Sequence, residues 1–333
     1  PSAAVDAERV VVFFPEYGLL AYDHAGQEHW RTPLGPYNNI YGMGASPILV
    51  DGVVILACDQ SRGSYVAAFS GASGEELWRS PRPWAKSGHC TPVVHRPDAG
   101  AAQILLPGSF YLDAYDVTTG ARVWWVSGLC PEMKSVPVLH EGVVYINGYA
   151  SPLNQPGNQV EVPEFAAVIA DRDEDEDGAI SAEEMIEGRV RGYFPFLDLD
   201  ESGTLDGEEW QYLRDSMAAL NGMLAIKVGG EGDRTQTNTV WSYRRSVPQL
   251  PSPLIYRDVL YMLNDQGGLL TTFEPLTGEV LERGRVAGLA DAVYAAPVAG
   301  GGQVILASES GLVAVLPAGG SLAPTAVFEF GES

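Results

Sequence analysis

The stretch Ala114–Trp125, "AYDVTTGARVWW", has the pattern of two short strands joined by a tight turn. The first strand is expected over residues 114–117, and the second ends on the aromatic pair Trp124 and Trp125. Threonine precedes Gly120 in the turn, and glycine is the residue that most easily adopts the positive φ that such a turn requires. The stretch therefore predicts a β-hairpin.

Copies of this hairpin occur elsewhere in the chain. They read "AYDHAGQEHW" at 21–30, "AFSGASGEELW" at 68–78 and, in a more divergent form, "TFEPLTGEVL" at 272–281. The recurrence of one strand–turn–strand unit indicates a repeat protein built from short strands.

A second marker, a small residue followed by proline and a short apolar strand, precedes the hairpins. The prolines are Pro47, Pro92, Pro137, Pro253 and Pro297, with Pro1 as the first, and the intervals are 46, 45, 45, 116 and 44 residues. A period near 45 residues with four strand-like segments is typical of β-propeller blades, and proline is tolerated as the first residue of a strand. We therefore expect an all-β propeller of four-stranded blades with one long insertion.

The hairpin resembles the repeat of the quinoprotein-like β-propellers, "A-x-D-x-x-T-G-x-x-x-W". The resemblance covers the chain apart from the insertion, and it departs from the motif at Ser70, which replaces the aspartate, and at Glu282, which replaces the tryptophan. It implies seven or eight blades in the complete protein, of which six are visible here. The group includes pyrroloquinoline quinone (PQQ) dehydrogenases and outer-membrane assembly lipoproteins, so the resemblance specifies a fold more than a function.

Charge and composition exclude several classes of protein. The 333 residues carry a net charge of −23, which leaves no basic surface for nucleic acid. No apolar run approaches the roughly 20 residues that a membrane span requires. Three cysteines, Cys58, Cys90 and Cys130, are an odd number without C-x-x-C spacing, which predicts buried free thiols.

The acidity is concentrated in the insertion, where residues 160–222 hold 18 acidic and 4 basic side chains. Two twelve-residue stretches within it, "DEDEDGAISAEE" at 173–184 and "DLDESGTLDGEE" at 198–209, share one pattern. Oxygen-bearing residues stand at positions 1, 3 and 5, glycine at 6, an apolar residue at 8 and glutamate at 12. This is the pattern of a calcium loop, since Ca²⁺ binds six to eight oxygens.

Each loop supplies six candidate ligands. In the first loop these are Asp173, Asp175, Asp177, the carbonyl of Ala179, Ser181 through water, and Glu184. In the second they are Asp198, Asp200, Ser202, the carbonyl of Thr204, Asp206 and Glu209. We therefore predict two Ca²⁺ sites.

Helical patterns flank the two loops. Apolar residues at helical spacing precede the first loop (Phe165, Val168, Ile169) and follow the second (Trp210, Leu213, Met217, Leu220). Ile180 and Leu205, at position 8, are placed to pair the loops, and Pro195 is expected to shorten the helix that enters the second. The insertion resembles an EF-hand pair, and glutamate at position 12 favours this over a dockerin-type pair. The alternative is a solvated acidic run whose spacing arose by chance.

The predicted organisation is propeller over 1–159, an EF-hand pair over 160–222 within the fourth visible blade, and propeller again over 223–333. In a four-stranded meander, the turn that carries the insertion lies at the same end as the connections between blades. The EF-hand pair should therefore overhang the face formed by those connections, the usual ligand face of a propeller. Its polar candidates are Asn39, Tyr41, Lys86, His89, Lys134 and Tyr294, with ordinary solvated loop residues as the alternative. Four tryptophans are expected to fill the gaps between blades, or alternatively to stack on a ligand: Trp30, Trp78, Trp124 and Trp241.

No catalytic motif is recognisable: there is no nucleophile elbow, H-E-x-x-H or phosphate loop, and the five histidines lack ligand spacing. We expect a non-catalytic calcium-binding propeller that serves as a binding or scaffold protein. Its partner would be a protein or small molecule at the face bearing the insertion. Export to the periplasm or extracellular space is expected, where millimolar calcium would fill weak sites. The alternatives are a PQQ-dependent oxidoreductase, for which no PQQ-binding residues are identifiable, and an outer-membrane assembly-factor-like lipoprotein.

Overall fold

The computed structural model describes residues 1–331, and their fold is mostly β. Over these residues the main strands form six antiparallel sheets of four strands each, in chain order, and one sheet gains a fifth strand. Each sheet after the first begins directly after one of the marker prolines; for example, strand β5 follows Pro47 and β13 follows Pro137. Sheets of four strands that follow in chain order confirm the predicted repeat, and we call them blades 1–6.

Blades 1–3 come from the first part of the chain. Blade 1 contains β1 (Ala4–Val5), β2 (Val10–Phe14), β3 (Gly18–Tyr22) and β4 (Glu28–Thr32). Blade 2 contains β5 (Ile48–Val50), β6 (Val53–Cys58), β7 (Tyr65–Ser70) and β8 (Glu76–Pro81). Blade 3 contains β9 (Val93–His95), β10 (Gln103–Pro107), β11 (Tyr111–Asp116) and β12 (Arg122–Ser127).

Blades 4–6 complete the series. Blade 4 contains β13 (Val138–His140), β14 (Val143–Gly148), β17 (Gly222–Lys227) and β19 (Thr239–Tyr243). Blade 5 contains β20 (Leu254–Tyr256), β21 (Val259–Leu263), β22 (Leu269–Phe273) and β23 (Val280–Arg285). Blade 6 contains β24 (Val298–Gly300), β25 (Gln303–Ala307), β26 (Leu312–Pro317) and β27 (Ala326–Glu329).

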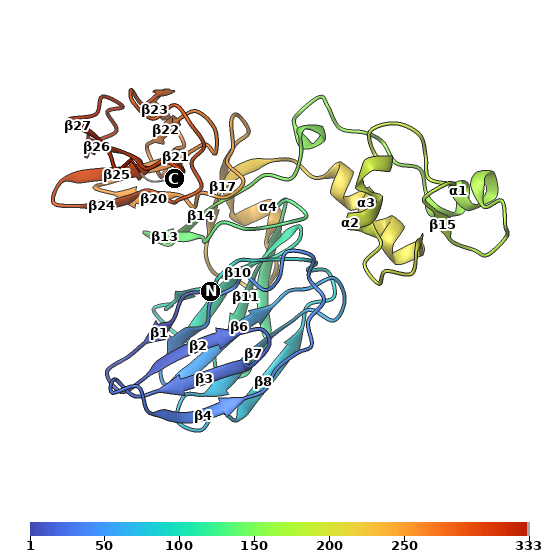
Figure 1. The fold of residues 1–333 in the computed structure, drawn as a ribbon, viewed down its shortest axis with the longest axis horizontal. Helices are drawn as coiled ribbons and strands as arrows, with labels where there is room; N and C mark the ends of the chain where they lie inside the picture. The colour runs from blue at the N-terminus through green and yellow to red at the C-terminus, as the bar shows by residue number, and fades with distance from the viewer. Residues whose placement is uncertain (332–333) are drawn as a thin grey trace.

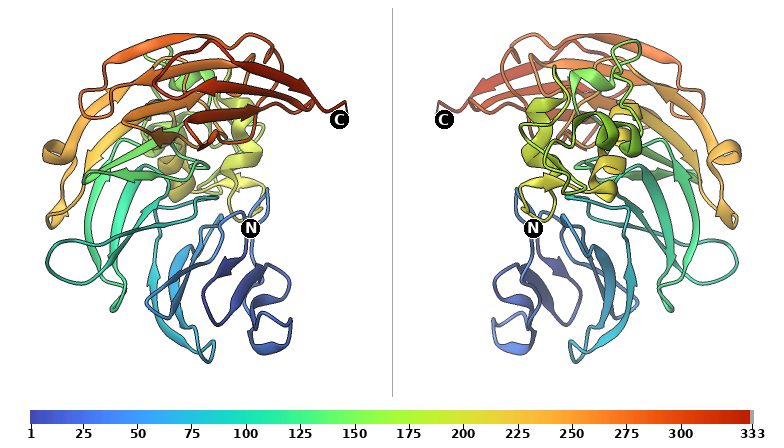
Figure 2. Two further views of the ribbon diagram at one scale, coloured as in Figure 1. Left: turned by 90° about the vertical axis from the view of Figure 1, so that its left-hand side faces the viewer. Right: turned by 90° about the vertical axis from the view of Figure 1, so that its right-hand side faces the viewer.

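The blades follow one another around an arc, with blade 1 in blue and blade 6 in red (Figures 1 and 2). Neighbouring blades cover both faces of the inner strands, so these strands are continuously apolar: β6 reads VVILAC and is almost entirely buried. The outer strands, such as β8, are largely exposed. A blade number of seven or eight for a longer protein stays a prediction.

The tryptophans join consecutive blades through the glycine turns. The indole N–H of Trp30 donates to the Gly71 carbonyl of blade 2 at 2.9 Å, and that of Trp78 donates to Val117 of blade 3 at 2.9 Å. Trp241 of blade 4 donates in the same way to Pro275 of blade 5 at 2.7 Å. These contacts place the three rings between blades, as predicted, where each buries apolar area and satisfies its polar edge.

Blades 3 and 4 meet differently. Blade 4 connects its last two strands through an eleven-residue segment, 228–238, instead of a short glycine turn. The segment contains β18 (Gly232–Asp233) and α4 (Thr235–Asn238), and β18 pairs in parallel with β12 opposite Trp124. Trp124 is fully buried, and its N–H donates to Gln103 within blade 3 at 3.0 Å.

Gly120→Ala is expected to destabilise the protein strongly. Gly120 has φ of +71°, and a Cβ there would lie 2.4 Å from the Trp78 ring of blade 2. The left-handed backbone and the forced shift of a packed ring together should lower the free energy of unfolding by about 2–4 kcal/mol. Gly142→Ala is the matched control, since its φ is +74° and no atom lies within 4 Å of the position that its added methyl carbon would take. Equal losses in denaturant unfolding would contradict a role for the ring contact.

Two details differ from the expected pattern. The hairpin strands are longer than predicted: β11 begins at Tyr111, and β12 continues beyond the aromatic pair to Ser127. The two strands extend together, because β11 and β12 stay hydrogen-bonded as far as the pair Tyr111 and Ser127. Leu220 lies past the end of its predicted helix, because the chain leaves the helix at Ala219 to enter β17.

The inserted module (residues 149–221) leaves blade 4 after β14 and returns at β17. It contains η1 (Pro152–Asn154), α1 (Phe165–Arg172), β15 (Ile180–Ser181), η2 (Arg191–Tyr193), α2 (Phe194–Leu197), β16 (Thr204–Leu205) and α3 (Gly207–Ala218). As expected, α2 is short and carries Pro195 in its first turn, and Ile180 pairs with Leu205 across β15 and β16. The module has its own apolar core around Trp210 and Leu213, both fully buried.

The module projects from the blades on the side reached by the β14–β17 turn (Figure 1). Its helices α2 and α3 lie nearer the blades, whereas α1 and β15 lie at its far end. We call the adjacent end of the propeller, formed by connections such as 33–47 and 82–92 and by turns such as 59–64, the insertion face. In residues 1–331 no helix has the length and apolar character to cross a membrane.

Candidate functional site

The first acidic loop, residues 173–184, is closed by hydrogen bonds from its own backbone. Asp173 accepts the N–H groups of Asp177 and Gly178 at 3.1 and 3.0 Å. Glu184 accepts the N–H of Glu174 with one carboxylate oxygen and that of Ser181 with the other, both at 2.8 Å. The glutamate therefore ties the end of the loop to its beginning.

The second loop, residues 198–209, repeats this network position by position. Asp198 accepts the N–H groups of Ser202 and Gly203, both at 2.9 Å. Glu209 accepts the N–H of Leu199 at 2.7 Å and that of Asp206 at 3.0 Å. Two separate sequences thus adopt one loop conformation.

The backbone conformations agree as well. Position 4 is left-handed in both loops, with φ of 61° at Glu176 and 60° at Glu201. Position 6 is left-handed too, with φ of 83° at Gly178 and 88° at Gly203, which explains the glycine there. The curled backbone turns alternate side chains toward the inside of the loop.

The carboxylates of each loop converge. One oxygen from each of Asp173, Asp175 and Asp177 lies within 4.8 Å of the others in the first loop. Asp198, Asp200 and Glu209 do the same in the second. Oxygens that share one Ca²⁺ at 2.3–2.6 Å lie no more than about 5 Å apart, so both clusters fit a calcium ion.

The remaining predicted ligands take various positions. Ser202 donates its hydroxyl to the Thr204 carbonyl at 3.0 Å, and Ser181 accepts the N–H of Glu184 at 3.3 Å. Asp206 caps α3, accepting the N–H groups of Glu208 and Glu209 at 2.8 and 2.9 Å. The N–H of Ala179 donates to the Asp177 carboxylate at 2.8 Å. Their roles as ligands stay predictions.

Burial separates the two closing glutamates. Glu209 is 1% exposed, and this desolvation raises its pKa against the opposing effect of its backbone donors. Glu184 is half-buried, and hydrogen bonds from Ser181 lower its pKa. The second loop therefore holds a buried carboxylate that needs a compensating cation.

Aromatic and charged contacts join the module to the insertion face. Phe196 stacks on Tyr41 with ring centroids 6.5 Å apart, and Tyr212 meets the edge of Phe110 at 5.7 Å. The buried Lys86 ammonium contacts Glu208 at 3.0 Å. The module is thus packed against blades 2 and 3 and their connections.

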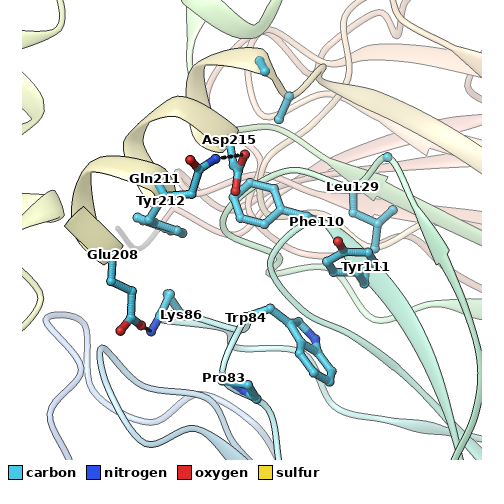
Figure 3. A pocket seen from close by; sticks show the side chains of 13 residues that line it. Pro83, Trp84, Lys86, Phe110, Tyr111, Leu129, Glu208, Gln211, Tyr212 and Asp215 are labelled. Carbon is cyan, nitrogen blue, oxygen red and sulfur yellow. Dashed lines mark hydrogen bonds and ion pairs between the residues drawn. The ribbon is translucent and has the colours of Figure 1, made fainter. Parts of the chain in front are cut away.

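A cleft of about 430 Å³ lies between α3 and blade 3. Figure 3 shows Glu208, Gln211 and Asp215 of α3 on one side of it and Trp84 and Tyr111 on the other. The Lys86–Glu208 ion pair crosses one end. The cleft has the size of a small-molecule site, with aromatic walls and a few polar groups.

A second cavity, of about 530 Å³, lies on the insertion face and brings together three of the predicted ligand-face residues, Tyr41, His89 and Lys134. Gly44, Gln249 and Leu250 complete its lining. Lys86 lines the α3 cleft instead, and Asn39 bonds to the Asp59 carbonyl at 3.1 Å. Tyr294 is 47% exposed and lines neither cavity.

His89 is expected to make stability depend on pH. Burial lowers its pKa below 6.5, an effect that Lys134 reinforces and Glu132 opposes. Between the lowered pKa and 6.5 the unfolded chain binds more protons, so the free energy of unfolding should fall as the pH is lowered through this window. Urea unfolding at several pH values should show this slope, and His89→Asn should flatten it; an unchanged slope would assign it to other groups.

The sequence motifs did not identify several residues of this region. Arg62, Trp84, Phe196 and Tyr212 all lie where the module meets the blades. Arg62 lies in the turn between β6 and β7, which corresponds in blade 2 to the turn that carries the insertion in blade 4. Because equivalent turns lie at the same end of a propeller, the sequence could indicate that this turn is near the module. It could not specify which side chains touch.

Comparisons with known proteins agree with this architecture. Residues 1–153 match the PQQ_2 family model, described as outer membrane protein assembly factor BamB. No curated protein matches the chain significantly in sequence. The crystal structure of BamB from Moraxella catarrhalis superposes with a TM-score of 0.59 and 14% identity, covering 98% of this chain and 76% of that one.

These matches support a PQQ-repeat β-propeller.

Two other solved structures share the fold. The computationally designed Ika8 protein has a TM-score of 0.52 and 10% identity, covering 95% of this chain and 70% of that one. Quinohemoprotein alcohol dehydrogenase ADHIIG from Pseudomonas putida HK5 has a TM-score of 0.50 and 12% identity; the match covers 95% of this chain but 55% of the enzyme. At these identities the likeness concerns the fold.

The cavity on the insertion face does not suit PQQ, a flat quinone with several carboxylates. Among the residues that line it, Lys134 and His89 are the basic side chains, and Glu132 already neutralises Lys134 at 2.8 Å. The lowered pKa of His89 keeps its imidazole neutral near pH 7. A polyanion would therefore find little positive charge there.

Proposed function

We propose that this chain is an exported, calcium-binding propeller that serves as a non-catalytic binding scaffold. The inserted module would be an EF-hand pair with one Ca²⁺ in each loop. The observation that carries the proposal is the repetition of one closed loop geometry at residues 173–184 and 198–209, each with a converging carboxylate cluster.

The role of the metal follows from the charge that it would neutralise. Residues 160–222 hold 18 acidic and 4 basic side chains, and their mutual repulsion opposes folding of the module. Two divalent cations would relieve this repulsion and stabilise the folded module, since they bind the folded loops preferentially. The module in turn supplies one wall of the α3 cleft, so that wall depends on the folding of the module, which calcium would stabilise.

Calorimetric titration of the chelator-treated chain with CaCl₂ tests the proposal. We expect two ions per chain and a rise in the temperature of unfolding with calcium concentration. Magnesium at the same concentration serves as the control for nonspecific charge screening. Absence of calcium uptake would reject the module as a metal site.

The second candidate is an envelope assembly factor that binds a protein partner. The family match over residues 1–153 favours it, and the exposed aromatic residues of the insertion face, such as Tyr41 at 58% exposure, offer a contact surface. Affinity purification of the chain with and without calcium, followed by identification of membrane-protein partners, separates this role from small-molecule binding. A PQQ-dependent oxidoreductase, the third possibility, predicts dye-linked alcohol oxidation after incubation with PQQ and calcium.

A further inference from the structure

Arg62 of blade 2 extends into the second acidic loop of the module. Its Nη2 lies 2.9 Å from Asp206 Oδ2, 3.2 Å from Asp200 Oδ2 and 3.2 Å from Glu209 Oε1. These carboxylates stand at positions 3, 9 and 12, so all three belong to the predicted calcium ligands. One guanidinium nitrogen therefore contacts half of that ligand set.

The first loop has no such contact. Within residues 1–331, no ion pair joins Asp173, Asp175, Asp177 or Glu184 to a basic side chain. The two loops otherwise share their backbone and hydrogen-bond geometry, as described above. The difference between them comes from the propeller, since Arg62 and Asp206 are 144 residues apart in the chain.

A guanidinium and a calcium ion cannot occupy this position together. Calcium binds its oxygen ligands at 2.3–2.6 Å, and in this loop those ligands would include the same oxygens that Arg62 contacts. The two positive charges would also stand a few ångströms apart beside the buried Glu209, and charges at that separation repel each other. Without metal, Arg62 supplies the cation that this buried carboxylate requires.

We infer that Arg62 is a tethered cation that competes with Ca²⁺ for the second loop and makes metal binding there oppose the docking of the module on blade 2. The inference rests on the proposed calcium sites and adds their regulation. Because coupling is reciprocal, calcium weakens the Arg62 contact by the factor by which Arg62 weakens calcium binding. The first loop then binds calcium independently, and the second responds to whether the module is docked.

The test uses the full chain with one loop silenced at a time. Glu184→Gln leaves the second loop as the metal site, and in this background Arg62→Gln should raise calcium affinity about tenfold, within the usual range for coupled sites. Glu209→Gln leaves the first loop as the metal site, and in this background Arg62→Gln should leave the calcium affinity unchanged. Arg31→Gln, which removes an exposed pair with Glu28, is the matched control for the loss of one positive charge. Hydrogen exchange supplies a second measurement: calcium should increase exchange in turn 59–64 of the wild type.

The outcomes separate the inference from the proposed function. If neither Glu184→Gln nor Glu209→Gln reduces calcium uptake, the calcium sites themselves are wrong. If both reduce it, but Arg62→Gln leaves the second-loop affinity unchanged or lowers it, the sites stand and the competition is refuted. A tenfold gain confined to the second loop, with faster exchange in turn 59–64, supports it.

Discussion

A chain carrying Glu184→Gln and Glu209→Gln together is expected to lose both calcium ions. Each glutamate occupies position 12 and uses its two oxygens to accept two backbone N–H groups, which fixes the carboxylate at the mouth of its loop. Glutamine replaces one of these acceptors with an NH₂ donor that faces a backbone N–H and repels the cation. Affinity at each loop should fall about 100-fold or more, since even outer partners of metal ligands contribute 10- to 100-fold.

Calorimetry of the chelator-treated double variant measures this loss. Glu183→Gln with Glu208→Gln is the matched control, because it changes the same charges at adjacent positions outside the predicted ligand set. The control should bind two ions, although loss of the Lys86–Glu208 pair should loosen the docking of α3. Circular dichroism verifies that both variants retain the blades. Unchanged stoichiometry in the ligand variant would contradict the site assignment.

The repeat architecture could be predicted because it depends on local sequence patterns. Each blade needs a turn glycine, an apolar inner strand and a large residue for the gap to its neighbour, and all three recur within about 45 residues. Gly120 and Trp78 show why the pattern is strict: the ring lies where a Cβ would be, so the two residues constrain each other. Glu282, in the place of a tryptophan, accepts the Leu322 N–H of blade 6 at 3.3 Å and so still links its blades.

The loops were predictable for the same reason, and their surroundings were not. Spacing within twelve residues determines which side chains turn inward, and the pairing of Ile180 with Leu205 follows from position 8. The contacts of Arg62 with Asp206 and of Lys86 with Glu208 span 144 and 122 residues. Such contacts depend on how the linkers and η1 orient the module over blades 2 and 3, and no local periodicity reports that orientation.

The cysteines illustrate how composition limits the prediction. Cys58, Cys90 and Cys130 are free and buried, as their odd number and spacing indicated. Burial raises the pKa of Cys58 to about 11, so the thiol stays protonated and unreactive at neutral pH. The sequence could not show that Tyr37 and Tyr65 flank Cys58 beneath the insertion face.

Arg82→Met is expected to destabilise the propeller by about 3–5 kcal/mol, the usual loss when one partner of a buried ion pair is removed. Arg82 is 0% exposed and joins blade 2 to blade 3: it contacts Asp59 at 2.8 Å and Asp113 at 2.9 Å. Asp113 retains Arg122 and the Trp84 indole N–H at 3.1 Å in the variant, but Asp59 loses its cation. The same network supports Trp84 at the wall of the α3 cleft, so the loss should also loosen that site.

The pH dependence of this loss identifies its cause. Burial already raises the pKa of Asp59, and Arg82 opposes that rise. Without Arg82 the pKa rises further, so the folded variant binds a proton that the unfolded chain has released, and its stability falls as pH rises above the unfolded value. The deficit of Arg82→Met in urea unfolding should therefore be smaller at pH 5 than at pH 7, and adding Asp59→Asn should recover part of it at pH 7.

The matched comparison is Arg31→Met, which removes an exposed pair with Glu28 and should leave stability nearly unchanged at either pH. If Arg82→Met lost no more stability than this control, the buried charge would be dispensable to the blade 2–3 contact. If its deficit were instead equal at pH 5 and pH 7, the cost would arise from lost packing against the Tyr115 ring rather than from an uncompensated carboxylate, because only the carboxylate is relieved by protonation.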